Sequence, residues 1–128
     1  NGAEALLRAG MAVGVHTHTH AILGHLPPTA QREEIRRARG LLQARLGTDA
    51  ALIAYPIGAR SAFTETTKEI AKEEGLRAGF SYYGGINHMG RIDPFDVRRI
   101  SFARFSTIDR VRCALARAAL SRHERPVA

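Results

Sequence analysis

Apolar residues recur along this chain at two different periods, which predict helices that alternate with short strands. Spacings of three and four residues predict helices over 3–9, 29–46 and 64–74, and a further helix that starts near residue 106. Short apolar runs predict strands over 11–15, 50–55, 77–81 and 97–102, and the glycine-rich segment 82–96 predicts a long loop.

Particular residues predict where the helices begin and which side chains face the core. Thr29 is a suitable N-cap for the second helix, and Ser106 with Asp109 resembles a capping box for the last helix. The predicted core-facing residues are Ile35, Ala38, Leu42 and Leu46 in the second helix, Thr67, Ile70 and Ala71 in the third, and Ile108, Val111, Leu115 and Ala118 in the last.

The order of these elements predicts an α/β fold with a mostly parallel sheet, because helices separate the successive strands. In parallel sheets, ligands bind beyond the carboxyl ends of the strands. Residues 16–20 directly follow the first predicted strand, and residues 55–58 follow the second. We therefore expect these two segments to lie at the same edge of the sheet.

Three histidines lie close together at the first of these strand ends, as His16, His18 and His20. Neutral imidazole is the commonest protein ligand for zinc and similar ions, and two imidazoles four residues apart can reach one ion if the backbone turns. A surface or packing cluster is the alternative. The position after a strand favours a metal site held by His16 and His20, with His18 in a supporting or solvent-facing position.

Two further segments are candidates for substrate contacts. Pro56 and Gly58 predict a turn after the second strand, which can either be a plain turn or present the backbone N–H of Ile57 to an oxyanion. Near the fourth predicted strand, Arg98 and Arg99 can pair with a carboxylate or a sugar group, or can simply be charges at the edge of the strand.

The histidine segment resembles the second motif of the polysaccharide deacetylase family, also called the nodulation-type deacetylase domain or carbohydrate esterase family four. That motif reads His-Ser/Thr-x-Thr-His after a strand, and His16, Thr17, Thr19 and His20 all match it. Residues 55–58 resemble the Tyr-Pro-aromatic-Gly form of the third motif, and residues 98–102 resemble a late Arg-Ile strand. The resemblance extends over about residues 3–105.

The resemblance implies a distorted (β/α) barrel, of which this chain would be the C-terminal portion without the N-terminal strands. It also implies hydrolysis of an N-acetyl, or sometimes O-acetyl, group on a polysaccharide, with a divalent metal, commonly zinc, as cofactor. His16 and His20 would be metal ligands, and Ile57 would donate its backbone N–H to the oxyanion. The residues that would contact the acetylated polysaccharide are Tyr55, Pro56, Gly58 and Arg99.

The chain also departs from the family pattern. No paired aspartates precede the histidines, Ala54 replaces an arginine of the third motif, and no Leu-x-His lies near the end. His88 in the long loop is a substitute candidate for the general acid. The aspartates that follow the histidines are Asp49, Asp93, Asp96 and Asp109. We therefore expect two of three metal ligands, no evident general base, and weak or no catalysis by the 128-residue chain alone.

Composition narrows the alternatives. The net charge of +7 comes mostly from arginine, and the densest arginine group lies along the predicted helix 29–46, as expected for a solvated helix face. We therefore expect no nucleic-acid partner. The single Cys113 excludes an internal disulfide and a multi-cysteine zinc site. No apolar run approaches the roughly 18 residues of a membrane span, and no signal peptide is evident, so the compartment stays open.

We predict one partial deacetylase domain over residues 1–121 and a flexible tail over residues 122–128. Two other classes of function stay open. One is a catalytically inactive carbohydrate- or metal-binding module on the same scaffold. The other is a basic nucleic-acid-binding domain, whose binding would collapse with salt and would not depend on His16 and His20.

Overall fold

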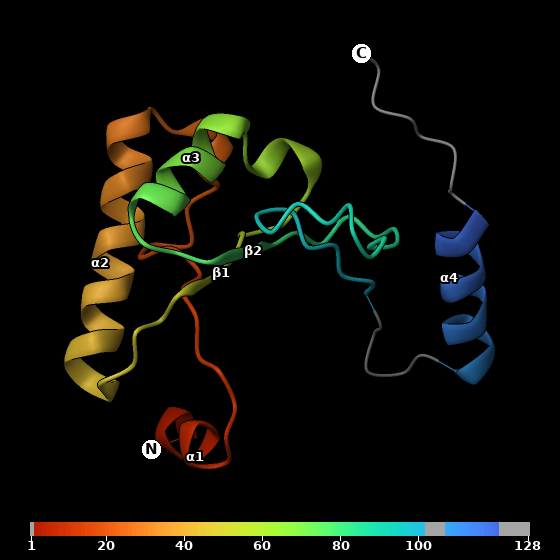
Figure 1. Cartoon of the computed structure of the whole chain (residues 1–128), viewed down its shortest axis with the longest axis horizontal. Coiled ribbons are helices and arrows are strands. Elements are labelled where there is room, and N and C mark those ends of the chain that lie inside the picture. The colour runs from red at the N-terminus through yellow and green to blue at the C-terminus, as the bar shows by residue number, and fades with distance from the viewer. Residues whose placement is uncertain (1, 102–106, 121–128) are drawn as a thin grey trace.

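The computed structural model describes residues 2–101 and 107–120. Its α-helices are α1 (Gly2–Arg8), α2 (Pro28–Leu46), α3 (Glu65–Glu73) and α4 (Ile108–Leu120), its 3-10 helices are η1 (Leu23–His25) and η2 (Arg60–Ala62), and its strands are β1 (Leu52–Ala54) and β2 (Ala78–Phe80). Figure 1 shows α2 and α3 side by side against the strand pair, with α1 and α4 standing apart from this body. None of the described helices is long and apolar enough to cross a membrane.

The sheet is parallel, as the alternation of elements predicted. Ile53 of β1 lies opposite Gly79 of β2, and single parallel bridges extend the sheet from Val15 to Ile53 and from Phe80 to Val97. The spatial order of the four segments is therefore their order along the chain. Because all four run in the same direction, their carboxyl ends meet at one edge.

Two of the predicted strands are much shorter than expected. Of residues 11–15 only Val15 pairs, and of residues 97–101 only Val97 pairs, while residue 102 lies outside the described ranges. Both segments lie at the two sides of this small sheet, where a strand has a neighbour on one side only. A ladder supported from one side has few hydrogen bonds to hold it, so each segment is reduced to a single bridge.

The starts of α2 and α3 test the predicted helix boundaries. α2 begins at Pro28, with Pro27 as N-cap in place of Thr29, because proline presets the helical φ and its missing N–H would have no partner there. α3 matches the predicted helix over 64–74 to within one residue at each end, and the Thr64 hydroxyl accepts the Thr67 N–H as a cap. The predicted inner face of α3 is confirmed, since Thr67, Ile70 and Ala71 are all buried.

α4 departs from its predicted packing. Ala118 is buried as expected, but Ile108 is 66% and Leu115 52% exposed, because α4 stands apart from the main body (Figure 1). The predicted cap Ser106 lies outside the described residues, and the Thr107 hydroxyl accepts the Arg110 N–H instead. The predicted tail over 122–128 also lies outside them.

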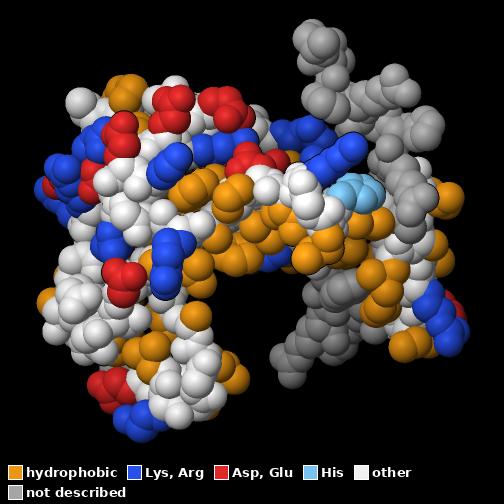
Figure 2. All heavy atoms as spheres, viewed as in Figure 1, with side chains coloured by type: hydrophobic (Ala, Val, Ile, Leu, Met, Phe, Trp, Pro, Cys, Tyr) orange, Lys and Arg blue, Asp and Glu red, His pale blue; other side chains and the backbone are white. Residues whose placement is uncertain are grey.

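The hydrophobic core lies between α2, α3 and the strands. Val15, Leu23 and Ile53 are buried in it, so the strand before the histidines and the 3-10 helix after them are both anchored. Other core members are Ile35, Ala38, Ala50, Tyr55, Ala62, Phe63, Ile70, Ala71 and Leu76. Figure 2 shows further hydrophobic side chains at the surface between α2 and α4, over the strands and the long loop.

Four arginines of α2 are engaged in ion pairs, of which the Arg37 pair lies within the helix and the others join it to its surroundings. The pairs are Arg32 with Glu73 and Glu74, Arg36 with Glu74, Arg37 with Glu33, and Arg39 with Asp49. Two of these arginines therefore bind α2 to the end of α3. Their charge is balanced within the domain, which favours a structural role over an electrostatic surface for nucleic acid.

Candidate active site

The predicted metal ligands lie together. The ring centroids of His16 and His20 are 4.8 Å apart, and the rings meet edge to face at 71°. Two imidazoles that bind one tetrahedral zinc ion through nitrogens at about 2.0 Å have ring centroids about 5 Å apart. The observed spacing therefore suits two ligands of one ion.

A hydrogen bond orients the first of these rings. Nδ1 of His16 lies 2.6 Å from the carbonyl oxygen of Ala54 on β1. A carbonyl oxygen can only accept, so this contact assigns the proton to Nδ1 and leaves a free lone pair on Nε2. Metal-binding histidines usually donate their other N–H to a carbonyl or carboxylate in this way. The Nε2 lone pair of His16 is therefore free to accept a ligand or a proton.

The backbone of the segment from His16 to His20 adopts an unfavourable conformation at two residues. Thr17 has φ +59° and His20 has φ +63°, in the left-handed region that side-chain-bearing residues rarely adopt. Such residues cost about 1–3 kcal/mol each and cluster at functional sites, where the surrounding structure holds them. Tertiary contacts must therefore hold this segment in place.

Glu34 on α2 provides these contacts, and the sequence analysis missed it. Its Oε2 accepts the backbone N–H groups of His18 and Thr19, both at 2.8 Å, and its Oε1 accepts the Thr19 hydroxyl at 2.9 Å. Burial raises the pKa of the Glu34 carboxyl, but the hydrogen bonds from Thr19 and His18 outweigh burial and leave this pKa below its usual value. Glu34 is therefore ionised at neutral pH and forms charge-assisted hydrogen bonds.

A cavity of about 490 Å³ opens beside the histidine pair. Its lining residues are His16, Tyr55, Ile57, Tyr82 and Arg99. The structure thus brings together segments that follow all four strand positions, and the parallel topology predicted this for residues 16–20 and 55–58. Of the five lining residues, Tyr82 is the one that the sequence analysis did not single out.

The turn after β1 places a strained residue on the cavity wall. The Gly58 N–H donates to the Pro56 carbonyl at 2.7 Å, which makes Ile57 the centre of a γ-turn with φ +63°. A positive φ is a true outlier for a β-branched residue. In the part of the chain that the structure describes, the Ile57 N–H has no acceptor. The turn therefore leaves a backbone donor available beside the cavity.

Tyr82 and Arg99 form another wall of the cavity. The Arg99 Nε donates to the Ser81 carbonyl at 3.0 Å, and its guanidinium lies 5.3 Å from the centre of the Tyr82 ring. The Tyr82 hydroxyl donates to Ser101 Oγ at 2.7 Å. These contacts fix an aromatic ring and a cation side by side, a combination that suits the faces and hydroxyl groups of a sugar.

Tyr55 borders the cavity but is almost wholly buried, and the remaining predicted site residues differ in their exposure. The Tyr55 ring is buried and stacks on Phe63 at 4.2 Å, and its hydroxyl donates to the Phe95 carbonyl at 2.9 Å. Burial raises the pKa of this phenol. Pro56 is buried too. His88 is exposed in the loop 82–96, and the residues that line the cavity do not include it.

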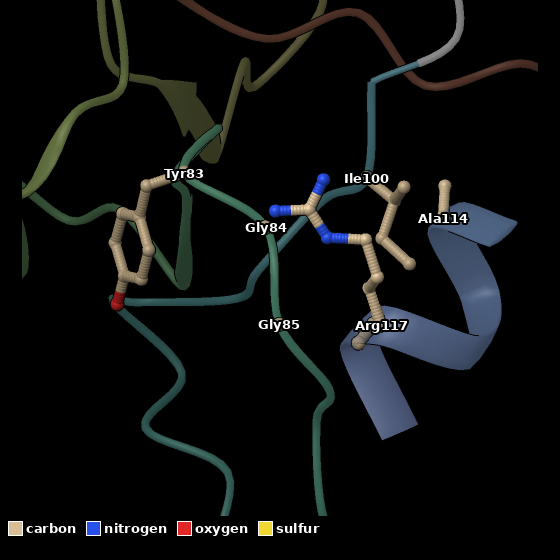
Figure 3. A pocket seen from close by; sticks show the side chains of 7 residues that line it. Tyr83, Gly84, Gly85, Ile100, Ala114 and Arg117 are labelled. Carbon is tan, nitrogen blue, oxygen red and sulfur yellow. The ribbon is translucent and has the colours of Figure 1, made fainter. Parts of the chain in front are cut away.

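A second cavity, of about 300 Å³, lies between the long loop and α4 (Figure 3). Figure 3 shows Arg117 extending from α4 toward Gly84. None of the predicted site residues lines this cavity, so the first cavity is the better candidate. The lining residues of the second are Tyr83, Gly84, Gly85, Ile100, Ala114, Arg117 and Ala118.

The fold is that of an α/β domain built on a small parallel sheet. The histidine pair and the strained turn at Ile57 lie at the carboxyl edge of this sheet, where α/β domains generally bind their ligands. The family model for polysaccharide deacetylases matches residues 1–79, which is more than half of the 128 residues. The chain belongs to the polysaccharide deacetylase family. A comparison with curated proteins gives no match.

Solved deacetylase structures share this fold. The deacetylase PplD of Streptococcus pyogenes, determined in complex with acetate, is 22% identical with a TM-score of 0.73, over 87% of this chain and 47% of that chain. IcaB from Ammonifex degensii is 26% identical with a TM-score of 0.69, over 91% and 50%. A polysaccharide deacetylase from Bacillus cereus is 18% identical with a TM-score of 0.70, over 88% and 34%. The chain therefore spans half or less of the length of these structures.

Proposed function

We propose that this chain forms the metal-binding part of a hydrolase that removes N-acetyl or O-acetyl groups from a polysaccharide. The observation that carries this proposal is the histidine pair, with centroids 4.8 Å apart, beside a cavity of about 490 Å³. Membership of the polysaccharide deacetylase family supports the class of reaction. The sheet ends in single bridges at Val15 and Val97, which suits a place within a larger, distorted (β/α) barrel.

His16 and His20 would hold a divalent ion, for which we propose zinc. When bound, such an ion supplies a Lewis acid that polarises the acetyl carbonyl and increases the acidity of water. The backbone N–H of Ile57 would donate to the carbonyl oxygen as negative charge develops there. The γ-turn at Ile57, which lines the cavity and leaves this N–H without an acceptor among the described residues, supports this role. Tyr82 and Arg99 would contact the sugar.

The histidine pair is an incomplete ligand set. Within residues 2–101 and 107–120, no group of three or more His, Cys, Asp and Glu side chains converges as a metal site. A third ligand and a general base would therefore have to come from elsewhere. The lack of a third converging ligand among the described residues favours a second candidate function, a binding module that retains the scaffold without catalysis.

Acetate, the product of the proposed reaction, tests the cavity directly. In the zinc-loaded chain, acetate is expected to bind in the cavity that His16 and Ile57 line. Amide NMR is expected to show acetate-dependent shifts at Ile57 and Gly58, and no such shifts without zinc or in the His16→Ala/His20→Ala variant. Equal shifts in that variant, or shifts confined to distant amides, would refute the placement of the site.

Acetate release separates the two candidate functions. Acetylated glucosamine oligomers would be incubated with zinc and with a polypeptide that joins this chain to a segment supplying a third ligand and a general base. Zinc-dependent acetate release supports the hydrolase, whereas oligomer binding without release supports the binding module.

A further inference from the structure

Three contacts converge on one carboxylate beside the histidine segment. Two backbone N–H groups, of His18 and Thr19, and the Thr19 hydroxyl all donate to Glu34, at 2.8, 2.8 and 2.9 Å. Hydrogen bonds to an ionised acceptor are roughly twice as strong as those between neutral groups. Glu34 therefore holds the middle of the segment between His16 and His20 by its main chain.

The position of Glu34 is itself fixed by the core. Its neighbour Ile35 is fully buried, and Gln31, one turn earlier on α2, is 3% exposed and donates to the Leu26 carbonyl at 2.9 Å. This face of α2 thus cannot rotate without losing core contacts. The carboxylate is presented to the histidine segment from a rigid element.

The segment between Val15 and Leu23 needs an attachment at its middle such as the one that Glu34 provides. Its ends are fixed by the bridge from Val15 to Ile53 and by the buried side chain of Leu23. Between these points, Thr17 and His20 keep positive φ values that cost free energy, so an unattached segment would relax toward ordinary backbone angles. Relaxation would turn the His20 ring relative to the His16 ring.

We propose that Glu34 is a positioning residue that sets the spacing of His16 and His20 before a divalent ion binds. This inference rests on the proposed function, because it assumes that the two histidines hold the ion. Glu34 contacts neither histidine ring in the structure. It acts through the main chain of His18 and Thr19.

The test uses the 128-residue chain, two variants of Glu34 and a matched control. Glu34→Ala removes all three acceptors, whereas Glu34→Gln keeps one oxygen that can still accept the two N–H groups. Glu33→Gln changes the adjacent residue of α2, which pairs with Arg37 at the surface. Zinc affinity is measured by calorimetry, and hydrogen exchange of the His18 and Thr19 amides is measured without metal.

Glu34→Ala is expected to weaken zinc binding by roughly 10–100-fold, as loss of a group that orients a metal ligand typically does. Glu34→Gln should give an intermediate loss, and Glu33→Gln should change the affinity by no more than about twofold, since surface ion pairs contribute little. The His18 and Thr19 amides should exchange at least about tenfold faster in Glu34→Ala than in the control.

Unchanged zinc affinity in Glu34→Ala would overturn the inference, even if the amides exchange faster, because Glu34 would then be only a structural contact. In that case the proposed metal site would still stand. If the unaltered chain bound no zinc through His16 and His20, the proposed function and this inference would both fail. The two failures are therefore distinguishable.

Discussion

The His16→Ala/His20→Ala variant is expected to lose zinc binding altogether, and each single variant is expected to bind zinc more than about 100-fold more weakly. The physical reason is that the described chain offers these two imidazoles and no converging third ligand. Removal of either ring leaves one nitrogen donor, which cannot chelate an ion. Calorimetric titration of zinc into the purified proteins measures this loss, with circular dichroism to confirm that each variant is folded.

Two other histidines provide the control for this experiment. His18 lies between the ligands, and His88 lies exposed in the long loop. His18→Ala and His88→Ala should each retain the zinc affinity of the unaltered chain within about threefold, because Glu34 holds His18 by its backbone N–H and not by its ring. A large loss in either control, with binding retained in the His16→Ala/His20→Ala variant, would place the metal elsewhere.

Gly58→Ala is expected to lower the free energy of unfolding by about 2–5 kcal/mol, which is a large fraction of a typical domain's stability. Gly58 has φ +66°, and a Cβ added there would lie 2.6 Å from the Cβ of Tyr82 and 2.7 Å from its backbone nitrogen. The contact cannot be relieved by a flexible side chain, since the Gly58 carbonyl also accepts the Tyr82 N–H at 2.8 Å. Urea denaturation followed by circular dichroism measures the change.

Gly40→Ala is the matched control. Gly40 lies within α2, and a Cβ added there would meet nothing within 4 Å. Alanine should therefore raise the free energy of unfolding, by up to about 1 kcal/mol, because it favours the helical backbone. Equal effects of the two substitutions would mean that the close approach between the Ile57 turn and Tyr82 is not a real constraint on the fold.

The predictions that the structure confirms rest on residue patterns that are visible in the sequence. The buried face at Thr67, Ile70 and Ala71 follows from spacing within one helix, and spacing is visible in the sequence. The parallel sheet followed from the alternation of strands and helices. That topology, combined with chain order, also predicted that residues 16–20 and 55–58 would share one edge, and His16 and Ile57 do line one cavity.

Features that depend on distant neighbours could not be predicted in this way. The lengths of the outer strands depend on pairing partners, so the segments at Val15 and Val97 reduce to single bridges. Glu34 reaches the histidine segment across 15 and 16 positions, and in the sequence it is one of several acidic residues on a charged helix. The near-complete burial of Tyr55, predicted as a substrate contact, also depends on distant residues, because its motif does not reveal on which side its ring packs.

Zinc K-edge X-ray absorption of the chain, loaded with one equivalent of zinc, tests the central claim most directly because it identifies the ligands. We expect two imidazole nitrogens at about 2.0–2.1 Å, with oxygen donors in the remaining positions. The imidazole signal should disappear in the His16→Ala/His20→Ala variant. A spectrum without imidazole ligands, or the same imidazole signal in that variant, would contradict the assignment of His16 and His20 as the metal-binding pair of a deacetylase.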